Sequence, residues 1–140
     1  MYGTAAALIT SPAGDLLLVK PNYRDYWQLP GGVLEEAEAP EAGCAREVLE
    51  EIGLGLPVGR LLTLAWLAPS GERPKPLLAF VFDGGVLGDF SGIKLQESEL
   101  DDFRLVPPSD LANYVPAPMA PRLLNALQAR ETGETIYLAT

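Results

Sequence analysis

A short acidic stretch near residue 50 holds the residues of this chain that are best suited to chemistry. Glu47 precedes Glu50 by three positions and Glu51 by four, and residues three or four apart share one face of an α-helix. Carboxylates placed in this way repel one another, and Arg46, which can reach Glu50, offsets only part of that repulsion. We therefore expect a divalent cation beside them. Hard oxygen ligands of this kind suit Mg2+ or Mn2+.

The helix that must position these carboxylates is bounded by two local signals. Pro40 suits the first turn of a helix and Gly53 suits the left-handed residue just past its end, so the pattern predicts a helix over residues 40–52. Gly43 inside it costs about 1 kcal/mol relative to alanine, so either a close neighbour requires the space or the helix begins later. Apolar residues at helical spacing predict the face that packs on a core, namely Ala45, Val48, Leu49 and Ile52.

A pair of glycines precedes this helix. Residues 29–32 read Leu-Pro-Gly-Gly, which predicts a loop whose backbone a phosphate or a metal can approach closely. By itself, such a turn more often only connects two elements of secondary structure. Its position ahead of the glutamates makes it a candidate part of the site.

The whole stretch resembles the motif of the Nudix hydrolase family. The resemblance covers residues 32–54, which is 23 of the 140 residues, and it is specific because every defined position of the motif is filled. The matching residues are Gly32, Glu38, Arg46, Glu47, Val48, Glu50, Glu51, Gly53 and Leu54. Ala37 stands where a glycine is common, and Gly43-Cys44 stand where alanines are common. These departures bear on local packing rather than on chemistry.

The resemblance implies a fold and an activity. The expected fold is α/β, a Nudix-type α/β/α sandwich with a mixed β-sheet, and residues 1–140 are expected to form a single Nudix hydrolase domain. The implied reaction is the metal-dependent hydrolysis of a diphosphate bond in a nucleoside diphosphate derivative or a nucleoside triphosphate. Mg2+ is the expected cofactor, with Mn2+ as a substitute, and a small-molecule nucleotide is the expected partner. Homodimers occur in the family, although nothing in these residues requires one.

The resemblance also implies metal ligands, position by position. The implied ligands are Glu47, Glu50 and Glu51, with the Gly32 carbonyl as a further ligand and Glu38 assisting the metal shell. Arg46 would orient the glutamates through charged hydrogen bonds.

The catalytic base is open between two glutamates. In this family the role moves between the motif helix and a later loop, so Glu47 is the first candidate and Glu99 the second. Glu99 belongs to the acidic run 96–102, just ahead of a predicted strand. A solvated loop is an equally good interpretation of that run.

The composition limits the alternatives. The chain has no histidine and a single cysteine, Cys44, which excludes histidine-based acid–base catalysis, disulfides within the chain and zinc clusters. A formal net charge of −9 argues against nucleic-acid polymers and anionic membranes as partners, and a polyphosphate should therefore enter together with metal. No apolar run is long enough to span a membrane, and the first nine residues lack the basic flank of a signal peptide. A cytoplasmic protein is expected.

The remaining pattern predicts a sheet covered by helices. Strands are predicted at residues 2–9, 16–20, 61–68, 77–82 and 103–106, a brief helix at 108–111 and an amphipathic helix at 120–130. Residues 135–138 have strand-like side chains without an evident place in the fold, and docking on a partner subunit is one interpretation of them.

The substrate is less well defined by the residues. Arg24 and Arg73 are candidates to bind phosphates, and Tyr26 is a candidate to stack on a base. Trp27 is expected in the core rather than on a base. Pro69 lies at a distance from the motif that is associated in this family with ADP-ribose hydrolysis, whereas oxidised or ordinary nucleoside triphosphates are at least as plausible.

Two other classes of protein stay open. A catalytically silent Nudix domain that senses a nucleotide would have lost metal glutamates, and none is lost here. A structural protein whose acidic helix is merely solvated would show no effect of Mg2+ on its thermal stability. A melting curve with and without Mg2+ separates this last class from the enzyme.

Overall fold

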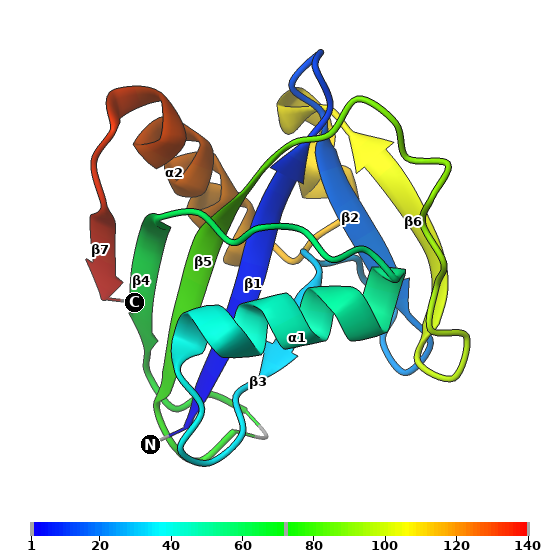
Figure 1. Cartoon of the computed structure of the whole chain (residues 1–140). Coiled ribbons are helices and arrows are strands. Elements are labelled where there is room, and N and C mark those ends of the chain that lie inside the picture. The colour runs from blue at the N-terminus through cyan, green and yellow to red at the C-terminus, as the bar shows by residue number, and fades with distance from the viewer. Residues whose placement is uncertain (1, 72, 140) are drawn as a thin grey trace.

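One mixed sheet organises the chain in the computed structural model, which describes residues 2–71 and 73–139 (Figure 1). Its strands are β1 (Gly3–Thr10), β2 (Leu16–Pro21), β3 (Gly31–Val33), β4 (Leu61–Leu67), β5 (Leu77–Val86), β6 (Leu100–Val106) and β7 (Ile136–Ala139). The strand order is β6-β2-β1-β5-β4-β7, and β3 pairs with β1 outside this path. The pairs β1–β5 and β4–β7 are parallel, and the other pairs of strands are antiparallel.

Helices cover both faces of this sheet. Figure 1 shows α1 (Pro40–Ile52) across one face, and α2 (Met119–Thr132) on the other face together with the 3-10 helix η1 (Pro108–Asn113). Each face has its own apolar cluster, because strand side chains alternate between the faces: Leu8 packs on the α2 side, and Ala7 and Ile9 pack on the α1 side. This layering confirms the predicted α/β/α sandwich with a mixed sheet.

The helix α1 has the predicted bounds. Pro40 lies in its first turn, and Gly53 ends it in the left-handed conformation at φ 71°. Gly43 is buried because its neighbours require the space: a Cβ built on it would lie 2.3 Å from the Leu34 side chain and 2.8 Å from the Glu38 carboxylate. Of the two interpretations of this glycine, the close neighbour is therefore correct.

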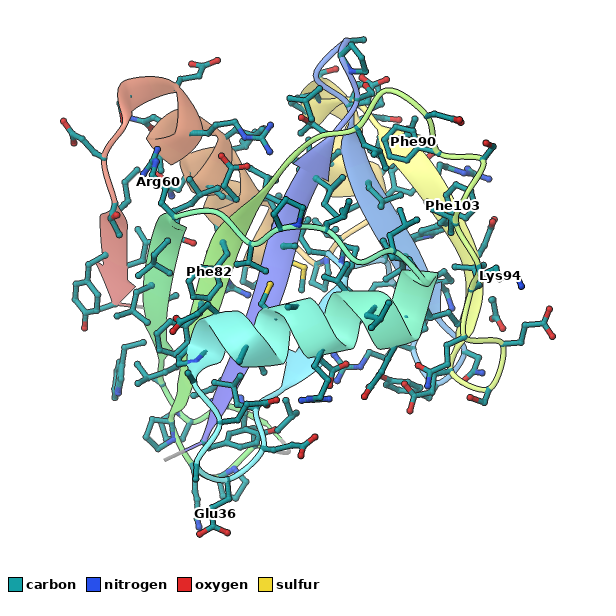
Figure 2. The ribbon with its side chains drawn as sticks, in the orientation of Figure 1. Glu36, Arg60, Phe82, Phe90, Lys94 and Phe103 are labelled. Carbon is teal, nitrogen blue, oxygen red and sulfur yellow. The ribbon has the colours of Figure 1, made fainter. Side chains whose placement is uncertain are left out.

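The buried face of α1 is narrower than its apolar pattern predicted. Cys44, Val48 and Ile52 are buried at four-residue spacing and pack on the sheet. Figure 2 labels three of the phenylalanines that belong to the same apolar cluster, Phe82, Phe90 and Phe103. The predictions for Ala45 and Leu49 are wrong, since Ala45 is exposed and Leu49 is 54% exposed. Each lies one position, about 100°, beyond the buried row and so faces solvent.

The glycine pair before α1 lies in a short strand rather than in the predicted loop. β1 pairs with β2 at Thr10 and Leu16, and nearer its start it pairs with β3 instead, with Ala5 opposite Gly32. A Cβ on Gly31 would lie 2.3 Å from the carbonyl oxygen of Ala5, so a residue without a side chain is required there. These glycines thus permit the backbone of β3 to approach the neighbouring strand β1 closely.

The turn ahead of α1 contains a strained residue. Ala37 has φ 62° and is the one non-glycine residue with positive φ in the described ranges 2–71 and 73–139. The left-handed conformation costs a residue with a Cβ roughly 1–2 kcal/mol. Hydrogen bonds between Glu35 and Glu38 close the turn on both sides of Ala37. The departure from the family pattern at this position therefore has a backbone cost.

The C-terminal strand belongs to the chain's own sheet. β7 pairs in parallel with β4 at the sheet edge, with Ile136 opposite Thr63, and this pairing replaces the interpretation that residues 135–138 dock on a partner. The other predicted elements are present with shifted ends, most of all β5, which continues to Val86, and β6, which begins at Leu100. No helix within residues 2–71 and 73–139 combines the length and the apolar character needed to cross a bilayer.

Candidate active site

Three glutamates face one cavity of about 510 Å³. Glu47 and Glu51 reach it from α1, and Glu99 reaches it from the turn just before β6. The walls also include the glycine pair of β3 and residues of β1, β4, β5 and α2. A cavity of this volume lies within the range of small-molecule sites, and the fold thus brings together carboxylates from two distant parts of the chain.

Glu51 is the most buried of these carboxylates. It is 3% exposed, and one of its oxygens accepts a 2.7 Å hydrogen bond from the backbone N–H of Gly31. Burial raises the pKa of Glu51 to about 8, and the nearby charge of Glu47 adds to this, while the Gly31 hydrogen bond opposes it. Without a cation, this carboxyl therefore keeps its proton at neutral pH.

Arg46 connects the other acidic residues of the motif. Its Nε donates to Glu38 Oε2 at 2.7 Å, and its guanidinium also contacts Glu47 at 3.0 Å and Glu50 at 3.3 Å. The hydrogen bonds from Arg46 lower the pKa of Glu38 to about 2, and the same contacts raise the pKa of Arg46. Arg46 therefore contacts three of the motif glutamates at once, and its role in orienting them stays a prediction.

Glu47 and Gly32 fit closely against each other. A Cβ on Gly32 would lie 2.6 Å from the Glu47 carboxylate, so the glycine leaves the room that this side chain fills. Burial raises the pKa of Glu47, although the hydrogen bond and the charge of Arg46 oppose this. The second glycine of the pair is thus needed for the acidic cluster itself.

Glu50 lies beside the cavity rather than in its wall. Its side chain is 47% exposed and contacts Arg46. Across residues 2–71 and 73–139, no three carboxylate or thiol side chains converge in a metal-binding arrangement. Glu47 and Glu50 turn toward Arg46 and Glu51 toward Gly31, so joint metal binding by the three glutamates would require side-chain rotation and stays a prediction.

The predicted substrate residues line this cavity or a hollow that shares residues with it. Arg24 and Arg73 line it, and both also line an adjoining hollow of about 870 Å³, to which Tyr26 contributes. The Arg24 guanidinium lies 5.4 Å from the ring centres of both Tyr23 and Tyr26, and it also donates to the Tyr26 hydroxyl. The adjoining hollow is therefore both aromatic and basic, which suits a nucleotide.

Two other aromatic or reactive residues have structural roles. Trp27 packs against the core edge-on to Tyr114, with ring centres 5.9 Å apart, which confirms the core interpretation of this residue. Cys44 is fully buried, and burial raises its pKa to about 12, so its thiol stays protonated.

Arg122 is a cavity residue that the sequence did not reveal. It lies in the first turn of α2, half-buried beside Met119 and Leu123. Burial and the positive charge of Arg73 lower the pKa of its guanidinium. Its only signal in the sequence is a basic residue in an amphipathic helix, which usually marks a solvated face.

Comparison with known proteins agrees with this geometry. The family model described as the NUDIX domain matches residues 2–129. A MutT-like protein of Streptomyces ambofaciens is 32% identical over 124 residues, which is 89% of this chain and 75% of that protein. An RNA pyrophosphohydrolase of Hydrogenovibrio crunogenus is 32% identical in an alignment of 110 positions, which covers 69% of this chain and 66% of that protein. The crystal structure of a MutT protein from Methanosarcina mazei Go1 has a TM-score of 0.76 at 26% identity, over 92% of this chain and 94% of that one.

The match to the family model extends far beyond the motif and includes α1, most of α2 and most of the sheet. The chain therefore belongs to the NUDIX family and is a Nudix hydrolase.

Proposed function

We propose that this chain hydrolyses a diphosphate bond in a nucleoside diphosphate derivative or a nucleoside triphosphate, and that it uses Mg2+, for which Mn2+ can substitute. The observation that carries the proposal is the convergence of Glu47, Glu51 and Glu99 on one cavity. The names of the relatives, a MutT-like protein and an RNA pyrophosphohydrolase, support hydrolysis of a diphosphate bond. The family match over residues 2–129 supports a single domain for residues 1–140.

The carboxylates of the site fit a divalent cation. Nudix hydrolases generally use divalent metals, and the donors here are hard oxygen atoms. Burial raises the pKa of both Glu47 and Glu51, in Glu47 despite its contact with Arg46, so a bound cation would stabilise the ionised form of both carboxylates. We assign the metal to Glu47, Glu50 and Glu51, with the Gly32 carbonyl as a further ligand and Glu38 in support. When bound, the cation compensates the charge of the diphosphate and lowers the pKa of water.

The chain's own residues then orient the reactants and move the proton. Arg46 holds Glu47 at the cavity wall, and Arg24 and Arg73 offer positive charge to phosphate groups of the substrate. Glu47 is the first candidate to accept the proton of the attacking water, because its raised pKa is closer to neutrality than that of an ordinary glutamate. Glu99 is the second candidate.

The two candidate bases can be distinguished by isosteric substitution. Turnover of Glu47→Gln and Glu99→Gln is measured at saturating Mg2+, so that a weaker affinity for metal does not obscure a slower proton transfer. The base is the residue whose substitution lowers kcat by roughly a hundredfold or more, within the range that general base catalysis contributes. If neither substitution slows turnover, both assignments are wrong.

A substrate panel tests the proposed function itself. The wild-type chain is incubated with ADP-ribose, other nucleoside diphosphate derivatives, and ordinary and oxidised nucleoside triphosphates, each with Mg2+ and with EDTA. Product phosphate is measured directly or after phosphatase treatment. We expect hydrolysis of part of the panel, and only with Mg2+. Nucleotide binding without hydrolysis of any compound would contradict the proposal and favour a silent sensor.

A further inference from the structure

Two arginines that line the cavity, Arg73 and Arg122, come from segments other than α1. Arg122 belongs to α2 and Arg73 to the connection between β4 and β5, whereas Glu47 and Glu51 come from α1, which covers the opposite face of the sheet (Figure 1). The charged neighbour that affects the pKa of Arg122 is Arg73, and none of the cavity's carboxylates does so. The cavity therefore has an acidic part and a separate basic part.

The positive charge of the basic part is not compensated within the described residues. The Arg73 guanidinium donates to the carbonyl oxygens of Ala68 at 3.0 Å and Lys75 at 2.8 Å, which fixes its plane but leaves its charge in place. Within residues 2–71 and 73–139, Arg122 has neither a carboxylate within ion-pair distance nor a hydrogen-bond partner. A half-buried guanidinium without a partner bears a desolvation cost that a bound anion would remove.

The other half-buried arginines of the chain show what a purely structural arginine looks like here. Arg46 is surrounded by the glutamates of the motif. Arg130 contacts Asp83 at 2.9 Å and also donates to the carbonyl oxygen of Leu8. Each of these has a carboxylate partner supplied by the fold. Arg73 and Arg122 lack such a partner and face a cavity instead, which is the arrangement of a binding site.

We propose that Arg73 and Arg122 form a second anion-binding site, which takes a phosphate group that the substrate carries apart from the diphosphate to be hydrolysed. This inference rests on the proposed function, because it places the scissile diphosphate at the glutamates. A guanidinium offers paired N–H donors that match two oxygens of a phosphate, and two guanidiniums suit its double charge. The substrate class is therefore a nucleotide with an additional phosphate monoester on the part beyond the diphosphate.

The test is the binding of inorganic phosphate to the full chain in EDTA, measured by the rise in melting temperature at constant ionic strength. Arg122→Gln should weaken phosphate binding by roughly tenfold or more, the loss expected when a charge-assisted hydrogen bond is removed. The phosphate affinity of Arg122→Lys should lie between those of the wild type and Arg122→Gln, because lysine keeps the charge and loses the paired donors. Lys94→Gln is the matched control, since it removes one positive charge from an exposed residue that does not line the cavity (Figure 2), and it should bind like the wild type.

Equal phosphate affinity of Arg122→Gln and the wild type, or no phosphate binding by the wild type, would overturn the proposal. Arg122-dependent binding of guanosine in the absence of phosphate binding would also overturn it, because the arginines would then recognise a base. If Arg122→Gln does not fold, Arg122→Lys decides by the same criterion. EDTA removes the metal and no turnover is measured, so this result is independent of whether the substrate panel shows hydrolysis.

Discussion

The acidic and the basic parts of the cavity are built in different ways. Glu47 and Glu51 are four positions apart on one helix, and their neighbour Arg46 holds the cluster together. Arg73 and Arg122 are 49 positions apart (122 − 73) and meet only when α2 packs on the sheet. The difference teaches that local spacing can predict a cluster of side chains on one helix, while the meeting of two cavity arginines depends entirely on tertiary structure.

The two parts also differ in how their charges are compensated. In the acidic part, Arg46 and the backbone N–H of Gly31 already bind carboxylate oxygens, so a cation would compete with existing contacts. In the basic part, Arg122 has no such contact among the described residues. We therefore expect the acidic part to control the rate of the reaction and its dependence on metal, and the basic part to control affinity.

The largest expected effect is that of Glu51→Gln. The substitution keeps an oxygen that can accept the Gly31 hydrogen bond but removes the charge that a cation requires, so kcat should fall by roughly a hundredfold or more. Its melting temperature in EDTA should be no lower than that of the wild type, because a buried carboxyl is replaced by an amide. The control is Glu97→Gln, which changes an exposed acid in the same loop as Glu99. Full activity of Glu51→Gln would show that the charge of Glu51 is not needed for the reaction and would contradict the role assigned to the acidic part.

A smaller effect is expected for Gly32→Ala. The new Cβ would lie 2.6 Å from the Glu47 carboxylate and would displace it, so kcat should fall by roughly ten- to a hundredfold. Gly55→Ala is the matched control, because a Cβ at Gly55 meets no atom within 4 Å among the described residues. Steady-state kinetics of the two variants at saturating Mg2+ measure the difference. Similar rates for both would show that the close fit of Gly32 and Glu47 has no catalytic importance.

The stability of the metal-free chain should depend on pH through Glu51. Folding raises the pKa of Glu51 from 4.5 to about 8, so between these values the folded state holds a proton that the unfolded state has released. The stability from this group is therefore present at low pH and is lost as pH rises toward 8. In EDTA, the melting temperature should fall by roughly 5–10 °C between pH 5 and pH 8.5.

Saturating Mg2+ should oppose that loss, because metal binding requires the ionised carboxylate and so becomes stronger as pH rises. Glu51→Gln should flatten the pH dependence measured in EDTA. A decline of the same size in Glu51→Gln would assign the effect to another group.

The smallest effect concerns the turn that leads into the acidic helix. Ala37 is exposed with φ 62°, and Ala37→Gly should raise the free energy of unfolding by about 0.5–1 kcal/mol, because glycine adopts this conformation without strain. Ala117→Gly is the control: Ala117 lies in an exposed turn without positive φ and should lose stability or stay the same. Chemical denaturation measures both. A loss of stability in Ala37→Gly would mean that the strain at this turn is relieved elsewhere.

Most of the acidic part could be predicted from the sequence, because its geometry is local. Helix periodicity places Glu47 and Glu51 on one face, and Pro40 and Gly53 mark the ends of α1. The prediction for Leu49 is wrong because an apolar side chain at helical spacing need not be buried, and the contact with the sheet covers only one row of α1. A local sequence pattern thus predicts the presence of a helix more reliably than it predicts which residues of that helix are buried.

The remaining features depend on contacts between distant segments. The pairing of β7 with β4 and the strand formed by Gly31 and Gly32 follow from the neighbouring strands, which no local pattern specifies. Glu99 could be proposed because the family resemblance pointed to its loop, whereas no comparable signal led to Arg122. Its position in the cavity follows from the way that α2 packs, which spacing along the chain does not contain.

The most direct test of the central claim is anomalous diffraction from a crystal of the full chain grown with Mn2+ and a non-hydrolysable nucleoside diphosphate analogue. Glu47 and Glu51 are predicted to coordinate an anomalous peak that also contacts the diphosphate oxygens. A nucleotide bound in the cavity with no Mn2+ at these carboxylates would contradict the account.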